Sequence, residues 1–405
     1  MKPIWIIWVT IATCGASHLL CAQQNNIPVV DSVLEARLSN LEKKTNLVHP
    51  GQSRLLVVGL TTFGYVSSRN VTTDADGNTV TTKNGVFGSG NTYEFSPMFL
   101  FKQGKRLLVE FEPSFNNDGL GVNWAAISYF ASPNVILRGG YFVLPFGMYN
   151  KKLAAGWINK VATDPIGLPT AQDYGIGASG GVQLGSIKWN YDVSVSNGFA
   201  LQNDGSISHV NLGANARGKT FSGRLGLLPL SNNSLEVGIS SLSGDAANGN
   251  ADFLGKKVNM YAFDLNYVKN FSPFQVNIKS QYNAINVDNQ NYQDTTKAKN
   301  NYSFTNSSTS GYGQFSLRPI DAKSNFIKNL EVAFRYGTYN SPQGSYWGNT
   351  QTQIDYGINY WITWRTVIRV TYELLEATTT ANKELNIPFS NSKTSALHIQ
   401  FSVQL

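Results

Sequence analysis

The chain has 405 residues, a formal net charge of +7 and only 14% charged residues. Apolar residues make up 42% of it, which excludes an intrinsically disordered chain. The absence of HExxH, Walker A and GxSxG motifs gives no support to an enzyme, and no basic cluster supports nucleic-acid binding. Low charge with 37 glycines, 19 tyrosines and 22 phenylalanines indicates many strands joined by polar loops.

The first residues have the pattern of a secretory signal peptide over 1–22. Lys2 gives a positive start, and the apolar run that follows is too short to span a bilayer. Cleavage after Ala22 would remove both cysteines, Cys14 and Cys21, with the signal. We therefore expect an exported mature chain with no disulfide, no cysteine metal site and no cofactor.

The segment 23–52 is expected to form a periplasmic helical leader. Within it, Leu34, Leu38 and Leu41 fall on one face of a helix over 27–46. The helix is too short to be stable alone in water. It is either a lone amphipathic helix or a short coiled coil that helps the protein to oligomerise.

Strict alternation of apolar and polar residues dominates from residue 53 to the end. In 329–339, for example, Val332, Phe334 and Tyr336 alternate with Glu331 and Arg335. A long series of such segments predicts an all-β, transmembrane antiparallel barrel of about 16 strands over 53–405. A soluble β-sandwich shows the same alternation, because both of its sheets turn apolar faces to a shared core.

The strands are expected in chain order, with connectors of two kinds between them. Tight turns, as at 102–105 and 132–134, alternate with long polar loops, as at 69–90 and 287–308, which is the asymmetry between the periplasmic and external ends of outer-membrane barrels. Two connectors depart from this rule: 116–120 is short and 319–328 is long. The expected strands are 54–68, 91–102, 106–115, 121–131, 135–146, 174–184, 187–198, 219–230, 235–244, 259–269, 274–286, 309–318, 329–339, 351–362, 365–376 and 394–405.

The third long loop, 147–173, differs from the others because it mixes apolar residues and prolines with charged ones. A solvated loop would not need that apolar content, so we expect it to fold into the barrel and narrow the channel; the alternative is an external lid or subunit latch. Together with inward-facing wall residues, this loop gives the candidate pore-lining set: Lys151, Lys152, Lys160, Asp164, Asp173, Arg106, Glu110, Arg138, Arg335 and Arg369.

One stretch carries a family resemblance. Gly140-Tyr141-Phe142-Val143-Leu144-Pro145-Phe146-Gly147 resembles a strand of the phosphate-selective porin O and P family, and Trp157-Ile158-Asn159-Lys160, Val195-Ser196-Asn197-Gly198 and Gly223-Arg224-Leu225-Gly226 are similar to segments of its relatives. The resemblance implies a trimer of 16-stranded diffusion pores. It does not imply phosphate selectivity, because the inward basic and acidic residues balance and favour at most a weak anion preference.

These observations predict a porin in the outer membrane of a Gram-negative bacterium. Its partners would be membrane lipid, small hydrophilic solutes or ions, and two further copies of itself. A barrel that serves as a surface adhesin or structural scaffold with a closed pore is the first alternative. A secreted soluble β-rich binding protein is the second.

Overall fold

A computed structural model describes residues 53–88, 92–117, 119–153, 158–169, 172–208, 218–246, 253, 255–293 and 301–405 of the protein. The expected signal peptide and the helical leader fall in 1–52 and therefore lie outside the described residues. No helix in the described part of the chain is long and apolar enough to cross a membrane.

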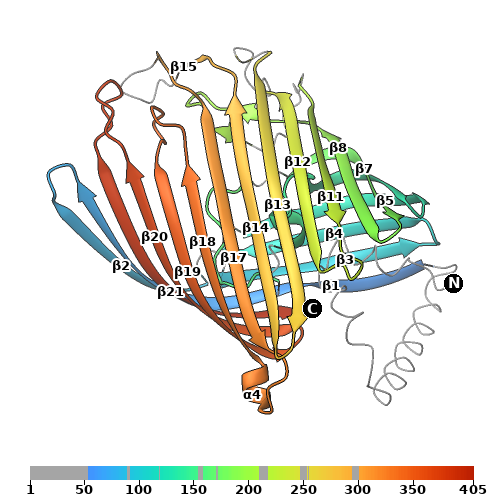
Figure 1. The fold of residues 1–405 in the computed structure, drawn as a ribbon. Coiled ribbons are helices and arrows are strands. Elements are labelled where there is room, and N and C mark those ends of the chain that lie inside the picture. The colour runs from blue at the N-terminus through green and yellow to red at the C-terminus, as the bar shows by residue number, and fades with distance from the viewer. Residues whose placement is uncertain are drawn as a thin grey trace.

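Sixteen antiparallel strands form a closed barrel, coloured from blue to red in chain order (Figure 1). The ring closes at β1 (Ser53–Asp74), which pairs with β3 (Tyr93–Gln103) on one side and with β21 (Ser390–Gln404) on the other. The other wall strands are β4 (Leu107–Asn116), β5 (Gly119–Ser132), β6 (Val135–Val143), β7 (Gln172–Leu184), β8 (Ile187–Ser196), β11 (Thr220–Leu228), β12 (Leu235–Asp245), β13 (Lys257–Phe271), β14 (Phe274–Val287), β17 (Ser307–Pro319), β18 (Leu330–Asn340), β19 (Thr350–Thr363) and β20 (Thr366–Thr379).

The wall strands turn their polar side chains towards the inside of the barrel and their apolar side chains outwards. On β18, Val332, Phe334 and Tyr336 are 51%, 40% and 46% exposed, whereas Glu331 and Arg335 are 2% and 0% exposed. A soluble sandwich would reverse these values, so the sandwich alternative is wrong. An exposed apolar face around a closed ring of strands matches a lipid bilayer, where every backbone donor and acceptor must be satisfied within the wall.

One sector of the wall departs from this pattern. On β3 to β6 the inward positions are also apolar and buried, and they belong to one cluster: Met98, Leu100, Leu108, Trp124, Ala126, Phe130, Ile136 and Phe142. Residues facing outward on the same strands, such as Phe99 and Phe111, are exposed. This sector of the inner face therefore carries an apolar lining beside its polar residues.

The connectors follow the predicted asymmetry, and both predicted exceptions are confirmed. The β4–β5 connection is short, and the β17–β18 connection is long and contains the single helical turn α4 (Asn325–Lys328). In Figure 1, α4 lies at the opposite end of the barrel from β15 (Asn291–Gln293), which belongs to a long connector. The first strand was predicted to end at residue 68, but β1 continues to Asp74 because its outer half pairs with β2 (Thr79–Phe87).

Candidate channel constriction

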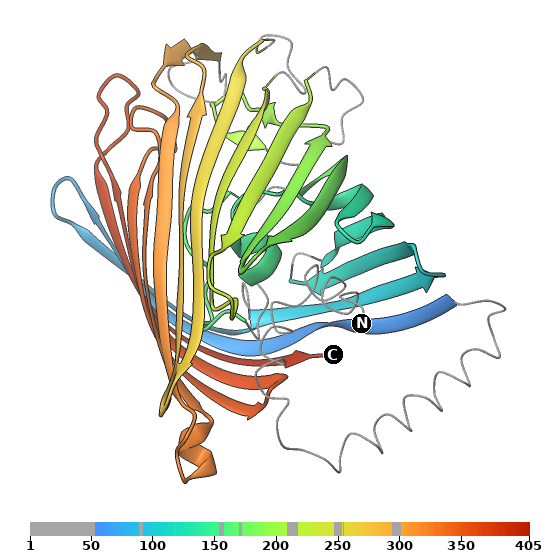
Figure 2. The same ribbon diagram turned by 45° about the vertical axis from the view of Figure 1, so that its right-hand side comes forward.

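The chain leaves β6 at Val143 and turns into the barrel, and from here on we call its described residues 144–153 and 158–169 the third loop. The fifth predicted strand thus ends three residues early. Gly147 makes the turn with φ +64, and a Cβ there would lie 2.2 Å from Nε2 of Gln281. Only glycine combines this backbone conformation with so close an approach to the opposite wall. The short coil after it, η2 (Tyr149–Leu153), lies between the walls in Figure 2.

Side chains of β12 and β14 hold the first half of the third loop. The Gly147 amide donates to Oγ of Ser240 at 3.0 Å. Oε1 of Gln281 accepts from the amides of Met148 at 2.8 Å and Tyr149 at 3.0 Å. A buried polar side chain of the wall thus satisfies backbone groups that would otherwise be left without partners inside the barrel.

Basic side chains of β14 and β20 hold the second half. Nζ of Lys279 donates to the Ile158 carbonyl at 2.7 Å. Nη1 of Arg369 donates to the carbonyls of Asn159 at 2.7 Å and Val161 at 3.3 Å, and its Nη2 donates to Oγ of Ser402 at 2.8 Å. Because Arg369 is 1% exposed, these bonds between a charged donor and backbone carbonyls are sheltered from water.

Each of the three lysines predicted to set the pore charge has an acidic partner on the wall. Lys151 pairs with Asp192 of β8. Nζ of Lys152 lies 2.7 Å from Oε1 of Glu236 on β12, and Nζ of Lys160 lies 3.2 Å from Oε2 of Glu331 on β18. A wall carboxylate therefore offsets the charge of each loop lysine.

Ion pairs within the wall continue this network on both sides of the loop. Arg224 of β11 donates to Asp264 at 2.6 Å and to Glu236 at 3.0 Å. Arg335 of β18 pairs with Asp355 at 2.8 Å and also contacts Thr163 of the third loop. Burial disfavours isolated charges, so the close pairing of these groups reduces the cost of placing them inside the barrel.

The predicted pore-lining set separates into groups. Lys151, Lys152, Lys160, Asp164, Arg335 and Arg369 meet at or on the third loop, where the Tyr149 hydroxyl donates to Oδ1 of Asp164 at 2.5 Å. Glu110 and Arg138 are buried on the inner face of the apolar sector, with Arg138 5.0 Å from the Trp124 ring centroid. Arg106 is exposed in the β3–β4 turn and donates to Tyr129.

Asp173 lies apart from the loop contacts at the start of β7. It is 1% exposed and accepts from the amides of Tyr174 and Gly198, both at 2.7 Å. Its partners are backbone amides of the wall ends. The geometry thus gives it a role in joining β7 to the end of β8.

Several residues that hold the third loop were not predicted. They are neutral polar residues at inward positions of the wall or within the loop: Ser240, Gln281, Gln353, Asn359, Thr371, Asn159 and Thr163. For those on strands, the inward-facing position could be predicted from the alternation of the sequence. Their contacts with the loop could not, because these depend on where the loop crosses the barrel.

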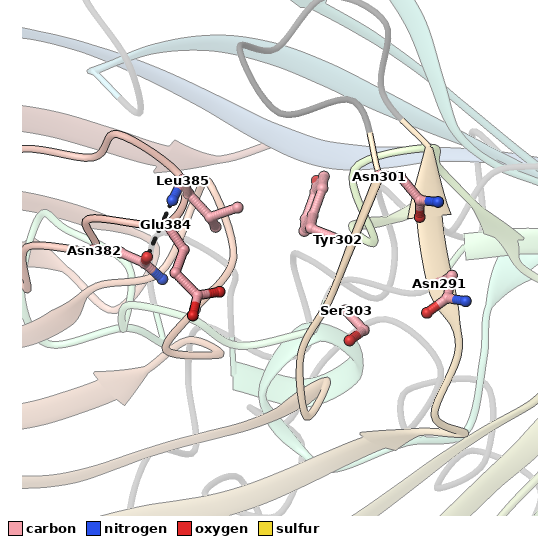
Figure 3. Close-up of a pocket in the computed structure, with 8 residues that line it drawn as sticks. Asn291, Asn301, Tyr302, Ser303, Asn382, Glu384 and Leu385 are labelled. Carbon is pink, nitrogen blue, oxygen red and sulfur yellow. Dashed lines mark hydrogen bonds between the residues drawn. The ribbon is translucent and has the colours of Figure 1, made fainter.

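A second feature lies among the external connectors. A cleft of about 340 Å³ separates the hairpin of β15 and β16 (Asn301–Ser303) from the β20–β21 connection (Figure 3). Its lining is polar and includes a single carboxylate: Asn291, Asn301, Tyr302, Ser303, Gly344, Asn382, Glu384 and Leu385. Among the described residues, no three of His, Cys, Asp and Glu gather closely enough to hold a metal ion.

The closed 16-stranded ring with an exposed apolar belt defines an integral β-barrel of the outer membrane. No family model and no curated protein matches the sequence. Among solved structures, the chain is similar in fold to the outer membrane channel DcaP of Acinetobacter baumannii, with a TM-score of 0.53 and 12% identity over 87% of this chain and 97% of that one. An anion-selective porin from Comamonas acidovorans gives 0.49 and 13% over 87% and 100%. At such identities the likeness shows the fold.

Proposed function

We propose that the protein is a porin that lets small hydrophilic solutes or ions diffuse across the outer membrane. The observation that carries this proposal is the third loop, which enters the barrel and is fixed on both sides by polar and charged side chains. A loop held in this way inside a polar-lined barrel narrows the passage without a need for moving parts. The similarity in fold to an outer membrane channel supports the proposal.

We further propose that the channel has at most a weak preference for anions. Six basic side chains belong to or contact the third loop, namely Lys151, Lys152, Lys160, Lys279, Arg335 and Arg369. Five acidic ones do so, namely Asp164, Asp192, Glu236, Glu331 and Asp355. The excess of one positive charge is small because most cations are paired. Confinement reduces screening by water, so even this excess can bias which ions enter.

Single-channel recording of the purified protein in a planar bilayer tests both statements. We expect single-channel current steps in symmetric salt. Under a salt gradient, the reversal potential should be small and should have the sign that anion permeation gives. An absence of conductance would contradict the porin proposal. A reversal potential set by cations would contradict the charge argument alone.

A barrel acting as an adhesin or scaffold remains the second candidate, and the packed external connectors favour it. Ring stacking in these connectors, such as 4.7 Å between the centroids of Tyr292 and Phe304, gives the outer end of the barrel a structured surface. A closed pore in this candidate would give no conductance and no solute uptake. The same recording therefore separates the two.

The resemblance to the phosphate-selective porin O and P family supports kinship at the level of the β6 stretch. Both glycines that bound this stretch occupy positions that exclude a side chain: a Cβ at Gly140 would lie 2.3 Å from the Ala125 carbonyl oxygen, and Gly147 makes the turn described above. We do not extend the kinship to phosphate binding, since the three loop lysines are paired with carboxylates.

We propose a homotrimer in contact with lipid, with β3 and β4 facing a neighbouring copy. Pro97 of β3 and Pro113 of β4 interrupt the ladder between Phe95–Phe115 and Phe99–Phe111. Interrupted pairing is costly against hydrocarbon and tolerated against protein. The exposed phenylalanines beside the gap give this face an apolar surface. Cross-linking of the detergent-extracted protein should give a trimer band; a monomer alone would contradict this.

We propose that 1–22 is an export signal and that 23–52 is a periplasmic leader. The physical support is the sequence pattern given above. N-terminal sequencing of the protein from outer membranes should begin at Gln23, whereas a retained Met1 would contradict the signal.

A further inference from the structure

Four external connectors converge on one another over the barrel mouth. We call their described residues the outer roof: 199–208, which contains β9 (Ala200–Leu201) and β10 (Ile207–Ser208), together with 288–293 and 301–306, 341–349, and 380–389. Buried apolar residues of three of these connectors belong to one cluster, among them Leu201, Tyr292 and Leu385 at 3%, 0% and 4% exposure, and Tyr346 of the fourth packs against it. A segment of solvated loops would leave such residues exposed.

The tip of the β9–β10 hairpin contacts two of the other roof connectors and joins them. The Asp204 carbonyl accepts from the Tyr302 hydroxyl at 3.3 Å and from Nε1 of Trp347 at 3.2 Å. The Gly205 carbonyl accepts from Nδ2 of Asn306 at 2.7 Å, and the same amide donates to the Tyr292 hydroxyl at 2.8 Å. All of these donors are neutral, so the joint does not depend on ionised groups.

Aromatic rings surround this tip and leave no room for a side chain on it. Gly205 has φ +84, and a Cβ there would lie 2.7 Å from Cζ of Phe304 and 3.0 Å from the Tyr292 ring. Tyr302 meets Tyr346 edge to face at 5.0 Å, and Phe304 meets Trp347 edge to face at 6.4 Å. Such ring pairs add to the energy of apolar burial and fix the relative position of the connectors.

The position of these contacts around the ring shows that they cross the mouth. The hairpin tip lies between β8 and β11, and Trp347 lies between β18 and β19. Along the shorter arc, six of the sixteen wall strands separate the two connectors: β11, β12, β13, β14, β17 and β18. Segments that are anchored so far apart on a closed ring can touch only by reaching over its opening.

We propose that the outer roof is a second selectivity element, a filter that sorts solutes by size at the external mouth before they reach the third loop. This inference rests on the proposed porin function and deepens it. The contacts that join the hairpin tip to the connectors across the mouth are rings and neutral hydrogen bonds, so they set the width of the opening and can be broken without a change of charge. Small neutral hydrophilic solutes would pass it, and larger ones of the same chemistry would be excluded.

Two glycine variants test the filter. Gly205→Ala places a Cβ against Phe304 and should displace the hairpin tip from the roof. Gly77→Ala is the matched control, because Gly77 sits at the β1–β2 tip with φ +83 and nothing lies within 4 Å of its Cβ. Both substitutions strain the backbone alike, and only the first disturbs the roof. Asn306→Ala, which removes two of the joining hydrogen bonds, gives a second route to the same opening.

Liposome swelling with a series of neutral sugars of increasing size gives the measurement. Gly205→Ala and Asn306→Ala should admit the larger sugars severalfold faster than the parent, with an unchanged reversal potential, and Gly77→Ala should match the parent. Equal swelling by all four proteins, each heat-modifiable on gels, would overturn the filter while leaving the porin function intact. If no protein admits any sugar or ion, both proposals fail. If the parent is closed and only the roof variants conduct, the roof is supported and free diffusion through the parent is refuted.

Discussion

The third loop and the outer roof both reach across the barrel, and charged contacts distinguish how they are fixed. Beside neutral side chains such as Gln281, the third loop is held by ion pairs and by charged donors to its carbonyls, such as Arg369 to Asn159. The roof is held by stacked rings and neutral donors, such as Asn306 to Gly205. Inside the wall, water is restricted and electrostatic attraction is strong. At the rim, water and salt screen charges, and removal of aromatic surface from water is the stronger attraction.

This difference assigns the two regions different tasks. A loop bound through charges to the wall places fixed charges beside the passage, and any change in them alters ion preference. A roof bound through rings sets the width of the opening and is indifferent to the sign of the solute. The following predictions test whether the two tasks can be separated.

Arg369→Ala should have the largest effect. It removes three hydrogen bonds, and each buried carbonyl of Asn159 and Val161 that is left unsatisfied costs about 1–3 kcal/mol. The second half of the third loop should detach, and single-channel conductance should rise and become noisier. Arg365→Ala is the control, because Arg365 is exposed and rests on the Trp364 ring. A conductance unchanged from the parent would show that the loop does not restrict the passage.

Reversal of one loop charge should change ion preference. Lys152→Glu sets two carboxylates against each other at Glu236, which should shift the reversal potential towards cations and lower the resistance of the barrel to heat. The swap Lys152→Glu with Glu236→Lys keeps the net charge and restores a pair, with a coupling of about 0.5–3 kcal/mol expected for groups in contact. A double variant no more heat-resistant than Lys152→Glu would show that the observed pair does not hold the loop.

Trp347→Ala should have a smaller and different effect. It removes the donor to the Asp204 carbonyl and the ring against Phe304, so uptake of larger neutral sugars should increase modestly. Ion preference should stay as in the parent, because no charge changes. Trp364→Ala is the matched control, since that ring is 56% exposed at a turn of the opposite end. A shift of reversal potential in Trp347→Ala would mean that roof and loop are coupled.

The smallest effect is expected from acid on the β1–β2 hairpin. The side-chain amide of Asn78, followed by its backbone amide, lowers the pKa of the Asp74 carboxyl from its ordinary value of 3.8. Because the folded pKa is depressed, the contribution of this turn to stability is present above the ordinary value and is lost as the pH falls through the folded one. Amide exchange at Asp76 and Asn78 should therefore accelerate only in that acidic range, and Asp74→Asn should abolish the dependence.

The roof supplies the contrast to that measurement. The donors that join it across the mouth are neutral, so exchange of the Gly348 amide, which is bonded to the Ser345 carbonyl beside Trp347, should show no matching transition. If amide exchange in both segments accelerated in the same acidic range, external contacts made by charges and those made by rings would not differ as proposed.

Much of the wall could be predicted because alternation is a local property. The period of two in 329–339 assigns Glu331 and Arg335 to one face and Phe334 to the other without knowledge of any neighbour. The predicted strand limits mostly lie within a few residues of the observed ones. The misses have local causes. The fifth strand ends early because the chain turns inward and Gly147 makes the turn, and the first strand runs on to Asp74 because its outer half pairs with β2.

The sequence by itself determined that the strands carry one apolar and one polar face, that short and long connectors alternate, and that the third loop carries more apolar residues than solvent would favour. The tertiary structure decided which residues of the loops and the wall contact one another. Lys160 meets Glu331 across a sequence separation of 171 residues, and Asp204 meets Trp347 across 143. Such pairs depend on the closure of the ring and on the path of two loops across it, and neither is encoded in the local period of any strand.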